Sequence, residues 1–422
     1  MSKLKNNIFS LLILQGSNYI IPLITLPYLT RTLGIQGFGI YGLTLTIAQY
    51  FILFTDFGFN FTATKKIAEN QNNKNYISRV FWITIFAKSI LCIISVITIL
   101  SLTQIKPLKI FTNELIFTSL MIIGTTIMPL WFFQGIEKLS KITIVTVTSK
   151  VLTLPLFFIL IKNYNDVWLA VLIQSSINLL SGFIAIYIIW KGKLVNYQTP
   201  RLKEIIFSLH DSSGIFLASI SISIYTISTS IIIGLVSKID QVSIFTGGDR
   251  LKSAILGVFL ILGNAFYPRI INLLSNNKND AFTLIRKIII FQSIITLLIG
   301  ITSFILAKYI AVTIYGESFS DVAIIITIFS PLYFFVTLST VFGNYILLPL
   351  GYKKEYISLP ILSAIIHIPL CTILAYNYGA LGGALSILIV ELISCFLLMC
   401  ILVKKNLFIP LFYVKANLKN EK

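Results

Sequence analysis

Charged residues are scarce in this sequence: 11% of its 422 positions are Asp, Glu, Lys or Arg, whereas 56% are hydrophobic. A soluble protein of this length could not bury so much apolar surface, so lipid must be the surrounding solvent. Negatively charged residues are rarer than positively charged ones, with 15 Asp and Glu against 33 Lys and Arg. In a soluble protein the net charge of +18 would suggest nucleic-acid binding. Here the cations lie between apolar segments, next to anionic headgroups, and we expect no nucleic-acid partner.

The motifs of common catalytic and nucleotide-binding sites are missing as well. There is no G-x-x-x-x-G-K-[ST] phosphate loop, so the chain is not expected to hydrolyse ATP. The four cysteines lie in apolar stretches without metal-ligand spacing, and the two histidines are isolated, so we expect no metal and no cofactor. No G-x-S-x-G motif or carboxylate pair lies in a polar loop. These absences favour a transporter over an enzyme.

About twelve apolar stretches make up most of the chain, and each is long enough to cross a bilayer core of roughly 30 Å as a helix. They lie near residues 8–30, 37–60, 80–102, 113–134, 141–162, 167–190, 207–236, 241–268, 286–307, 321–348, 356–376 and 380–403. Several contain proline, which removes a backbone donor and kinks a helix; Pro129 and Pro331 are examples. The pattern predicts an all-α polytopic membrane protein with about 12 transmembrane helices.

The most polar connection, residues 191–206, separates two groups of six spans. We therefore expect an N-terminal six-helix bundle, a cytoplasmic linker, a C-terminal six-helix bundle and a basic cytoplasmic tail, at 1–190, 191–206, 207–403 and 404–422. The fourth span of each half ends in a glycine followed three residues later by a lysine, at Gly135 and Gly351. An even number of spans per half gives a parallel repeat. Two such bundles around a central cavity are typical of an alternating-access carrier.

Lysine and arginine are distributed unequally between the two ends of these spans. Most of them fall on the side that holds the N-terminus. The opposite side holds only Arg31, Lys106, Lys109, Lys162, Lys238 and Lys308. Because cytoplasmic loops retain cations, both termini are predicted to be cytoplasmic.

Four cations lie inside the predicted spans, Lys88, Lys150, Arg250 and Lys252, and all four are candidates for binding substrate in a cavity. A cation near the bilayer centre costs at least about 2.5–3.5 kcal/mol on insertion scales, so it needs an aqueous cavity or a partner. Lys88 is about 12 Å deep by helical rise and could instead extend toward the cytoplasmic headgroups. Lys150 and Arg250 are more central, and we expect both to face a lumen.

The segment GGDRLKS, from Gly247 to Ser253, places an acid next to two of these cations. Asp249 and Lys252 are three residues apart and can pair along one helix face, which would leave Arg250 available for an anionic ligand. The opposite pairing remains open, because Asp249 and Arg250 differ by only about 100° around the helix.

Three further acids lie in predicted spans. Asp56 and Asp211 lie near cytoplasmic ends, where solvation or a salt bridge is expected. Glu391 is central in the last span and either pairs with a lumenal cation or carries a coupling proton.

Five segments resemble the signature blocks of a known family. PYLTRTLGIQGFGIYGL, at 27–43, is similar to the P-Y-[LIV]-x-R-x-L-G-x-x-x-F-G-x-Y block of bacterial O-antigen flippases, in the polysaccharide-transport branch of the multidrug/oligosaccharidyl-lipid/polysaccharide exporter superfamily. TDFGFNFTATKKIAE, at 55–69, and WFFQGIEKLSKIT, at 131–143, resemble the next two blocks. NAFYPRI, at 264–270, and LPLGYKKEY, at 348–356, resemble blocks of the second half.

The resemblance implies two six-helix bundles around a central cavity in the bacterial inner membrane. It implies transport of undecaprenyl-diphosphate-linked O-antigen repeat units from the cytoplasmic to the periplasmic leaflet, with an O-antigen polymerase and a chain-length regulator as partners. Cations line the cavity of family members. By motif, Arg31 is the arginine of the first block and Asp56 the acid of the second. A diphosphate and a polar glycan suit a positively charged lumen, because arginine matches phosphate oxygens.

Two other functions are compatible with twelve spans. A drug or cation antiporter of the same superfamily would share the fold but would need acids in its cavity, and here central cations outnumber acids. A membrane-embedded O-antigen polymerase would need a large periplasmic loop for its catalytic residues. The longest outward connection, near 308–320, is too short for that.

Overall fold

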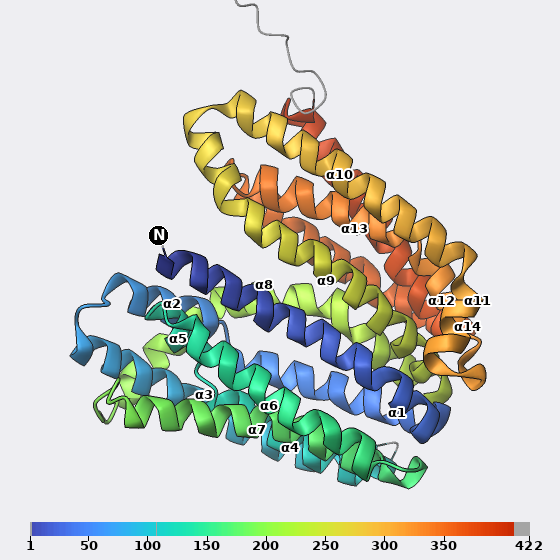
Figure 1. Cartoon of the computed structure of the whole chain (residues 1–422), viewed down its shortest axis with the longest axis horizontal. Helices are drawn as coiled ribbons and strands as arrows, with labels where there is room; N and C mark the ends of the chain where they lie inside the picture. The colour runs from blue at the N-terminus through green and yellow to red at the C-terminus, as the bar shows by residue number, and fades with distance from the viewer. Residues whose placement is uncertain (1, 107, 409–422) are drawn as a thin grey trace, which may run out of the picture. The chain divides into compact units, whose positions relative to one another are not determined.

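The computed structural model describes residues 2–106 and 108–408, and within them every regular element is a helix (Figure 1). The elements are α1 (Ser2–Asp56), α2 (Phe59–Glu69), α3 (Lys74–Leu102), η1 (Lys109–Phe111), α4 (Thr112–Ile127), α5 (Leu130–Gly135), α6 (Leu139–Leu160), η2 (Tyr164–Asp166), α7 (Val167–Lys191), α8 (Leu202–Val236), α9 (Ile239–Asn276), α10 (Lys278–Ile305), α11 (Ala307–Tyr315), η3 (Glu317–Phe319), α12 (Val322–Phe329), α13 (Leu332–Thr340), η4 (Val341–Leu347) and α14 (Lys353–Lys404). The predicted all-α membrane fold is confirmed.

Seven helices of the described chain are long and apolar enough to cross a membrane, or eight if a bent pair counts as one span. Two of the longest helices each contain two predicted spans. Helix α1 is interrupted at Gly34, with φ +65°, and α14 is interrupted at Gly379, with φ +55°. Only glycine adopts such positive φ values without strain, so one residue turns the chain between spans where the sequence predicted a short loop. The predicted spans 207–236 and 241–268 coincide with α8 and α9, so the helices fit the count of twelve.

By its internal contacts the chain divides into two compact units, Met1–Thr246 and Gly247–Lys422. In the first unit, α4 and α7 pack closely because both carry glycine at the contact. A Cβ on Gly124 would lie 2.4 Å from the backbone of Asn178, and one on Gly182 would lie 2.8 Å from the carbonyl oxygen of Gly124. Small residues at helix contacts are how membrane helices approach one another. The apolar core of this unit includes the fully buried Trp131 and Phe133 of α5.

The second unit has its own apolar core, made by α10, η4 and α14 together with the end of α9. The predicted span 321–348 is not straight: α12 and the helical stretch 332–347 meet at 43°. Pro331 stands at the start of α13, directly after this bend, and its missing N–H cannot continue the α12 ladder. The expected proline kink is confirmed at this position.

The linker between the predicted bundles is anchored to the first unit. The backbone N–H of Asn196 donates to Ser78 Oγ (2.9 Å), and its carbonyl accepts from Trp82 Nε1 (3.0 Å). Helix α8 then packs against α1 and α3, so it belongs with Met1–Thr246. The predicted boundary between two six-helix bundles at 191–206 was based on the sequence repeat. The internal contacts divide the chain at a different place, so this boundary stays a prediction. Residues from 409 onward of the predicted tail 404–422 lie outside the described chain.

Candidate functional site

In the first unit, the buried cation Lys88 forms an ion pair with Asp56. Lys88 Nζ lies 2.7 Å from Asp56 Oδ1, and the lysine is only 1% exposed. The same ammonium donates to the carbonyl of Thr125 (3.3 Å), while Asp56 Oδ2 accepts from Asn60 Nδ2 (2.7 Å). The network joins the ends of α1 and α2 to α3 and α4, so a cation in the apolar interior is neutralised inside the protein.

Of the environments expected for Lys88, the structure shows a partner, Asp56, and neither an aqueous cavity nor the headgroups. With 1% exposure, the ammonium neither faces open water nor reaches the headgroups. Asp56 ends α1 because Phe57 (φ +43°) and Gly58 (φ +80°) leave the helical conformation. The turn places the carboxylate beside α3, which explains why an acid 32 positions away becomes the partner.

Lys150 has a different environment, with neutral partners only. It lies on α6, is half-buried, and donates to Ser17 Oγ (3.2 Å) and to Asn18 Oδ1 of α1. No carboxylate lies within salt-bridge distance of it in the described part of the chain. The positive charge of Lys150 is therefore solvated by dipoles but not neutralised.

In the second unit, Lys252 Nζ lies 2.5 Å from Asp249 Oδ1, which confirms the pairing predicted from the i, i+3 spacing. The ammonium also lies 4.9 Å from the ring centroid of Phe329, a cation–π distance. Lys252 interacts electrostatically with Glu391 and with the fully buried His367, both on α14. The structure thus brings Asp249, Lys252 and Glu391 into one polar cluster inside the unit.

Arg250, next to this ion pair in sequence, has no salt bridge within residues 2–106 and 108–408. It is half-buried and interacts electrostatically with Tyr315, whose hydroxyl donates to the carbonyl of Gly247 (2.7 Å). Asp249 is committed to Lys252, so Arg250 keeps a positive charge that a ligand could neutralise. Of the two pairings that the helical angles left open, the structure shows Asp249 with Lys252.

Two predicted site residues of the first unit, Arg31 and Asp211, lie outside the Lys88 network, and Glu391 of the second unit belongs to the Lys252 cluster. Arg31 is exposed on α1, one turn before the break at Gly34. Asp211 on α8 pairs with Lys66 of α2 at 2.7 Å. Glu391 is half-buried on α14. Solvation or a salt bridge was expected for Asp56 and Asp211, and each forms a salt bridge.

Sequence reasoning missed several neutral residues of these networks. Ser17 and Asn18 solvate Lys150, and Asn60 and Thr125 complete the Lys88 pair. A polar Ser-Asn pair inside the apolar span 8–30 was the available signal. Among the described residues, no group of three His, Cys, Asp or Glu side chains could hold a metal ion.

Comparison with protein families gives a match over residues 4–274 to the family described as "Polysaccharide biosynthesis protein". The chain belongs to this family. An Escherichia coli (strain K12) protein named as a proposed O-antigen transporter is 33% identical over 403 residues, covering 94% of this chain and 96% of the relative. A Shigella dysenteriae protein with the same name is 28% identical over 394 residues, covering 92% and 98%. The family resemblance inferred from the motifs is confirmed.

Solved structures with the same fold include two kinds of transporter. One is a lipid II flippase, MurJ, in an inward closed conformation, with a TM-score of 0.72 at 14% identity, covering 97% of this chain and 89% of that one. Another is an inward-facing multidrug resistance MATE family transporter of the MOP superfamily, with a TM-score of 0.64 at 13% identity, covering 93% and 98%. At these identities the likeness concerns the fold alone.

Proposed function

We propose that this protein is a flippase that moves undecaprenyl-diphosphate-linked O-antigen repeat units from the cytoplasmic to the periplasmic leaflet of the bacterial inner membrane. Relatives named as proposed O-antigen transporters, aligned over nearly the whole chain, support transport of a lipid-linked polysaccharide. The observation that carries the proposal is that Lys150 and Arg250 lie inside spans as cations without a carboxylate partner in the described chain.

These two cations suit the diphosphate of the cargo. Bringing a diphosphate into the membrane interior is unfavourable unless positive charge compensates for lost water, and a charge-assisted hydrogen bond is worth about 1.5–3 kcal/mol. The guanidinium of Arg250 binds phosphate oxygens in a fork, whereas Lys150 acts as a point charge. Arg31, exposed on α1, provides a third cation.

The two neutralised cations have a structural role in this proposal. Lys88 is paired with Asp56 and Lys252 with Asp249, so neither offers a free positive charge to the cargo. The first pair joins α1 to α3, and Lys252 holds α9 against Phe329 of α12. Glu391, near Lys252, is the residue that could change protonation during the cycle.

The transport cycle follows from the proposed architecture. Two six-helix bundles, 1–190 and 207–403, rock to expose a positively charged lumen alternately to each leaflet, and the polyprenyl chain stays in lipid. Both termini are cytoplasmic. The flipped units pass to an O-antigen polymerase and its chain-length regulator. The chain acts as a transporter and not as an enzyme, and no step uses ATP.

A multidrug or cation antiporter is the second candidate, favoured by the fold shared with the MATE family transporter. A cationic substrate would need unpaired acids. Asp56, Asp211 and Asp249 each have a lysine partner at 2.5–2.7 Å. Glu391 has no salt bridge among the described residues but interacts with Lys252, so the paired acids argue against a cationic substrate. An O-antigen polymerase is disfavoured by the short outward connections.

The test is complementation of a strain that lacks the gene. Arg250→Glu and Arg31→Glu should abolish surface O-antigen while the membrane level of the protein is unchanged. Lys287→Glu is a matched control, because this exposed cation lies on α10 outside the networks described above. Normal O-antigen with both variants would refute transport through a positively charged lumen.

A further inference from the structure

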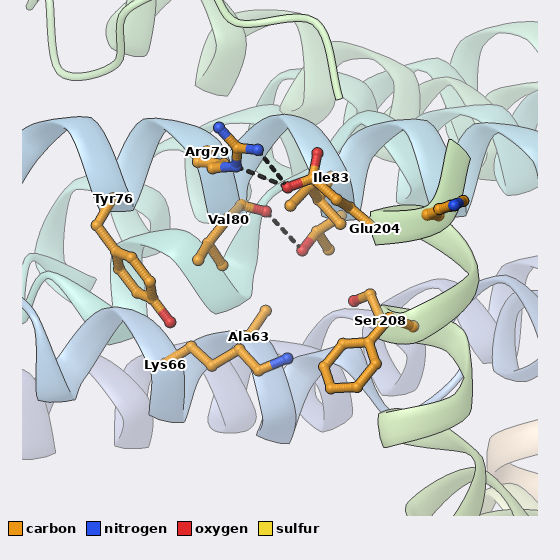
Figure 2. Close-up of a pocket in the computed structure, with 11 residues that line it drawn as sticks. Ala63, Lys66, Tyr76, Arg79, Val80, Ile83, Glu204 and Ser208 are labelled. Carbon is orange, nitrogen blue, oxygen red and sulfur yellow. Dashed lines mark hydrogen bonds and ion pairs between the residues drawn. The ribbon is translucent and has the colours of Figure 1, made fainter. Parts of the chain in front are cut away.

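A pocket of about 360 Å³ lies in the first unit where α2, α3 and α8 meet, and neither Lys150 nor Lys88 lines it. Its apolar side is made by Ala63, Val80, Ile83 and Phe207. Three cations line it, Lys66 from α2, Arg79 from α3 and Lys203 from α8, together with a single acid, Glu204. Figure 2 shows Lys66, Arg79 and Glu204 around the opening, with Ser208 beside them.

The charges of the pocket are only partly compensated. Arg79 Nη2 lies 2.5 Å from Glu204 Oε1, and Lys66 Nζ lies 2.7 Å from Asp211 Oδ2. Lys203 is exposed and has no salt bridge in the described part of the chain. With both ion pairs counted, about one positive charge remains, which matches a monoanion better than a diphosphate.

Ser208 supplies a hydroxyl group at the same place. It is 8% exposed, and its hydroxyl points into the pocket in Figure 2. A serine hydroxyl that lines a pocket can donate a hydrogen bond to a ligand oxygen. The pocket therefore offers a positive charge and a hydroxyl donor above an apolar floor.

The surroundings identify the ligand as a lipid. The first two turns of α8 carry Leu202, Ile206 and Phe207, which are 66%, 57% and 68% exposed. Because α3 and α8 begin here, the pocket lies at the ends of membrane helices, on the side where cations are concentrated. Anionic headgroups are attracted to such positions, and apolar side chains next to them contact the acyl chains.

We propose that this pocket binds the phosphate headgroup of an anionic phospholipid of the cytoplasmic leaflet, with Lys203 and Ser208 on the phosphate and the acyl chains along Ile206 and Phe207. The lipid fastens the start of α8 to α2 and α3. The site is separate from the transported cargo, and its existence does not depend on what the protein transports.

The experiment uses the purified full-length chain in detergent. Bound lipid is counted by native mass spectrometry, and thermal unfolding is followed with added phosphatidylglycerol, with phosphatidylcholine of the same acyl chains, or with inorganic phosphate. Phosphatidylglycerol should bind and stabilise, and the other two should not. Lys203→Gln should weaken its binding about fivefold, because a basic side chain at an anionic surface contributes about 1 kcal/mol. Ser208→Phe should fill the pocket and abolish binding.

The matched control is Lys141→Gln, which removes an exposed cation from α6 outside the pocket and should bind like the native chain. If Ser208→Phe does not fold, the proposal is tested by comparing phosphatidylglycerol binding of Lys203→Gln with that of Lys141→Gln. If both variants weakened phosphatidylglycerol binding equally, the lipid would be attracted to the basic surface in general and not to this pocket. That result would overturn the proposal. So would equal stabilisation by phosphatidylcholine or inorganic phosphate, or displacement of phosphatidylglycerol by equimolar undecaprenyl diphosphate.

Discussion

Lys88 Nζ and Asp56 Oδ1 lie 2.7 Å apart, although the lysine is on α3 and the aspartate is the last residue of α1. The pair lies in the interior of the first unit, where the lysine is 1% exposed. The depth of Lys88 in the membrane alone would suggest that it faces a lumen. Its ion pair shows that it is part of the scaffold instead. The free cations, Lys150 and Arg250, are distinguished by lacking such a carboxylate among the described residues.

Removing one partner of this pair should destabilise the protein strongly. Asp56→Ala would leave Lys88 charged and without its carboxylate, and we expect a loss of about 3–5 kcal/mol in the free energy of unfolding. The double variant Asp56→Ala/Lys88→Met should lose clearly less, because no buried charge remains. Chemical unfolding in detergent micelles measures both. Losses that add up in the double variant would show that the two residues are not coupled.

Replacing Lys150 should reduce transport without reducing stability. Lys150→Gln removes a positive charge that the cargo would use, so we expect at least about a tenfold lower flipping rate. The variant also removes the cost of desolvating a half-buried ammonium, so its melting temperature should equal or exceed that of the native chain. Lys141→Gln on the same helix is the control and should transport normally. A slow variant that is also unstable would point to a structural role for Lys150.

The break in α1 should require glycine at position 34. Gly34 has φ +65° and ψ −177°, a backbone region almost restricted to glycine, and a Cβ there would meet no atom within 4 Å. Gly34→Ala should therefore cost about 1–3 kcal/mol through backbone strain alone. Gly16→Ala in the same helix also meets open space, without a positive φ, and should be neutral or stabilising by up to about 1 kcal/mol. Equal effects in unfolding experiments would contradict this account of the break.

The ion pair between Glu204 and Arg79 should make stability depend on pH. A hydrogen bond from the backbone N–H of Arg201, and the neighbouring Arg79, hold the pKa of Glu204 below its ordinary value. A carboxylate with a lowered folded-state pKa stabilises the protein above its unfolded pKa, and this contribution is lost as pH falls through the folded value.

The melting temperature of the native chain should therefore fall more steeply between about pH 6 and pH 3 than that of Glu204→Gln. Glu69→Gln removes an exposed acid whose lysine partner is 3.9 Å away, and it should follow the native curve. Parallel curves for the native chain and Glu204→Gln would exclude a pH-dependent role for Glu204.

Features that depend on neighbours along the chain could be predicted from the sequence. The helical spans follow from apolar runs, the bend at Pro331 follows from proline chemistry, and Asp249 and Lys252 pair because three residues separate them. The break at Gly34 was predicted as a loop, since a sequence does not reveal that one glycine can turn a helix.

The partners of the other buried cations could not be predicted, because they depend on how helices pack. Asp56 and Lys88 are 32 positions apart, and Lys150 and Asn18 are 132 apart. Their meeting depends on the turn at Phe57 and on the register of α6 against α1. Asn18 is neutral, so the charge pattern of the sequence could not indicate it as a partner of Lys150.

The central claim is that Lys150 and Arg250 supply the positive charge that the diphosphate requires. Its most direct test is the flipping rate of a fluorescent undecaprenyl-diphosphate-linked sugar in proteoliposomes. Lys150→Gln/Arg250→Gln should flip at least about 100-fold more slowly than the native chain, from two lost charge-assisted contacts. The double control Lys141→Gln/Lys287→Gln, which removes the same charge from exposed positions, should flip at the native rate. A native rate for Lys150→Gln/Arg250→Gln would contradict the account.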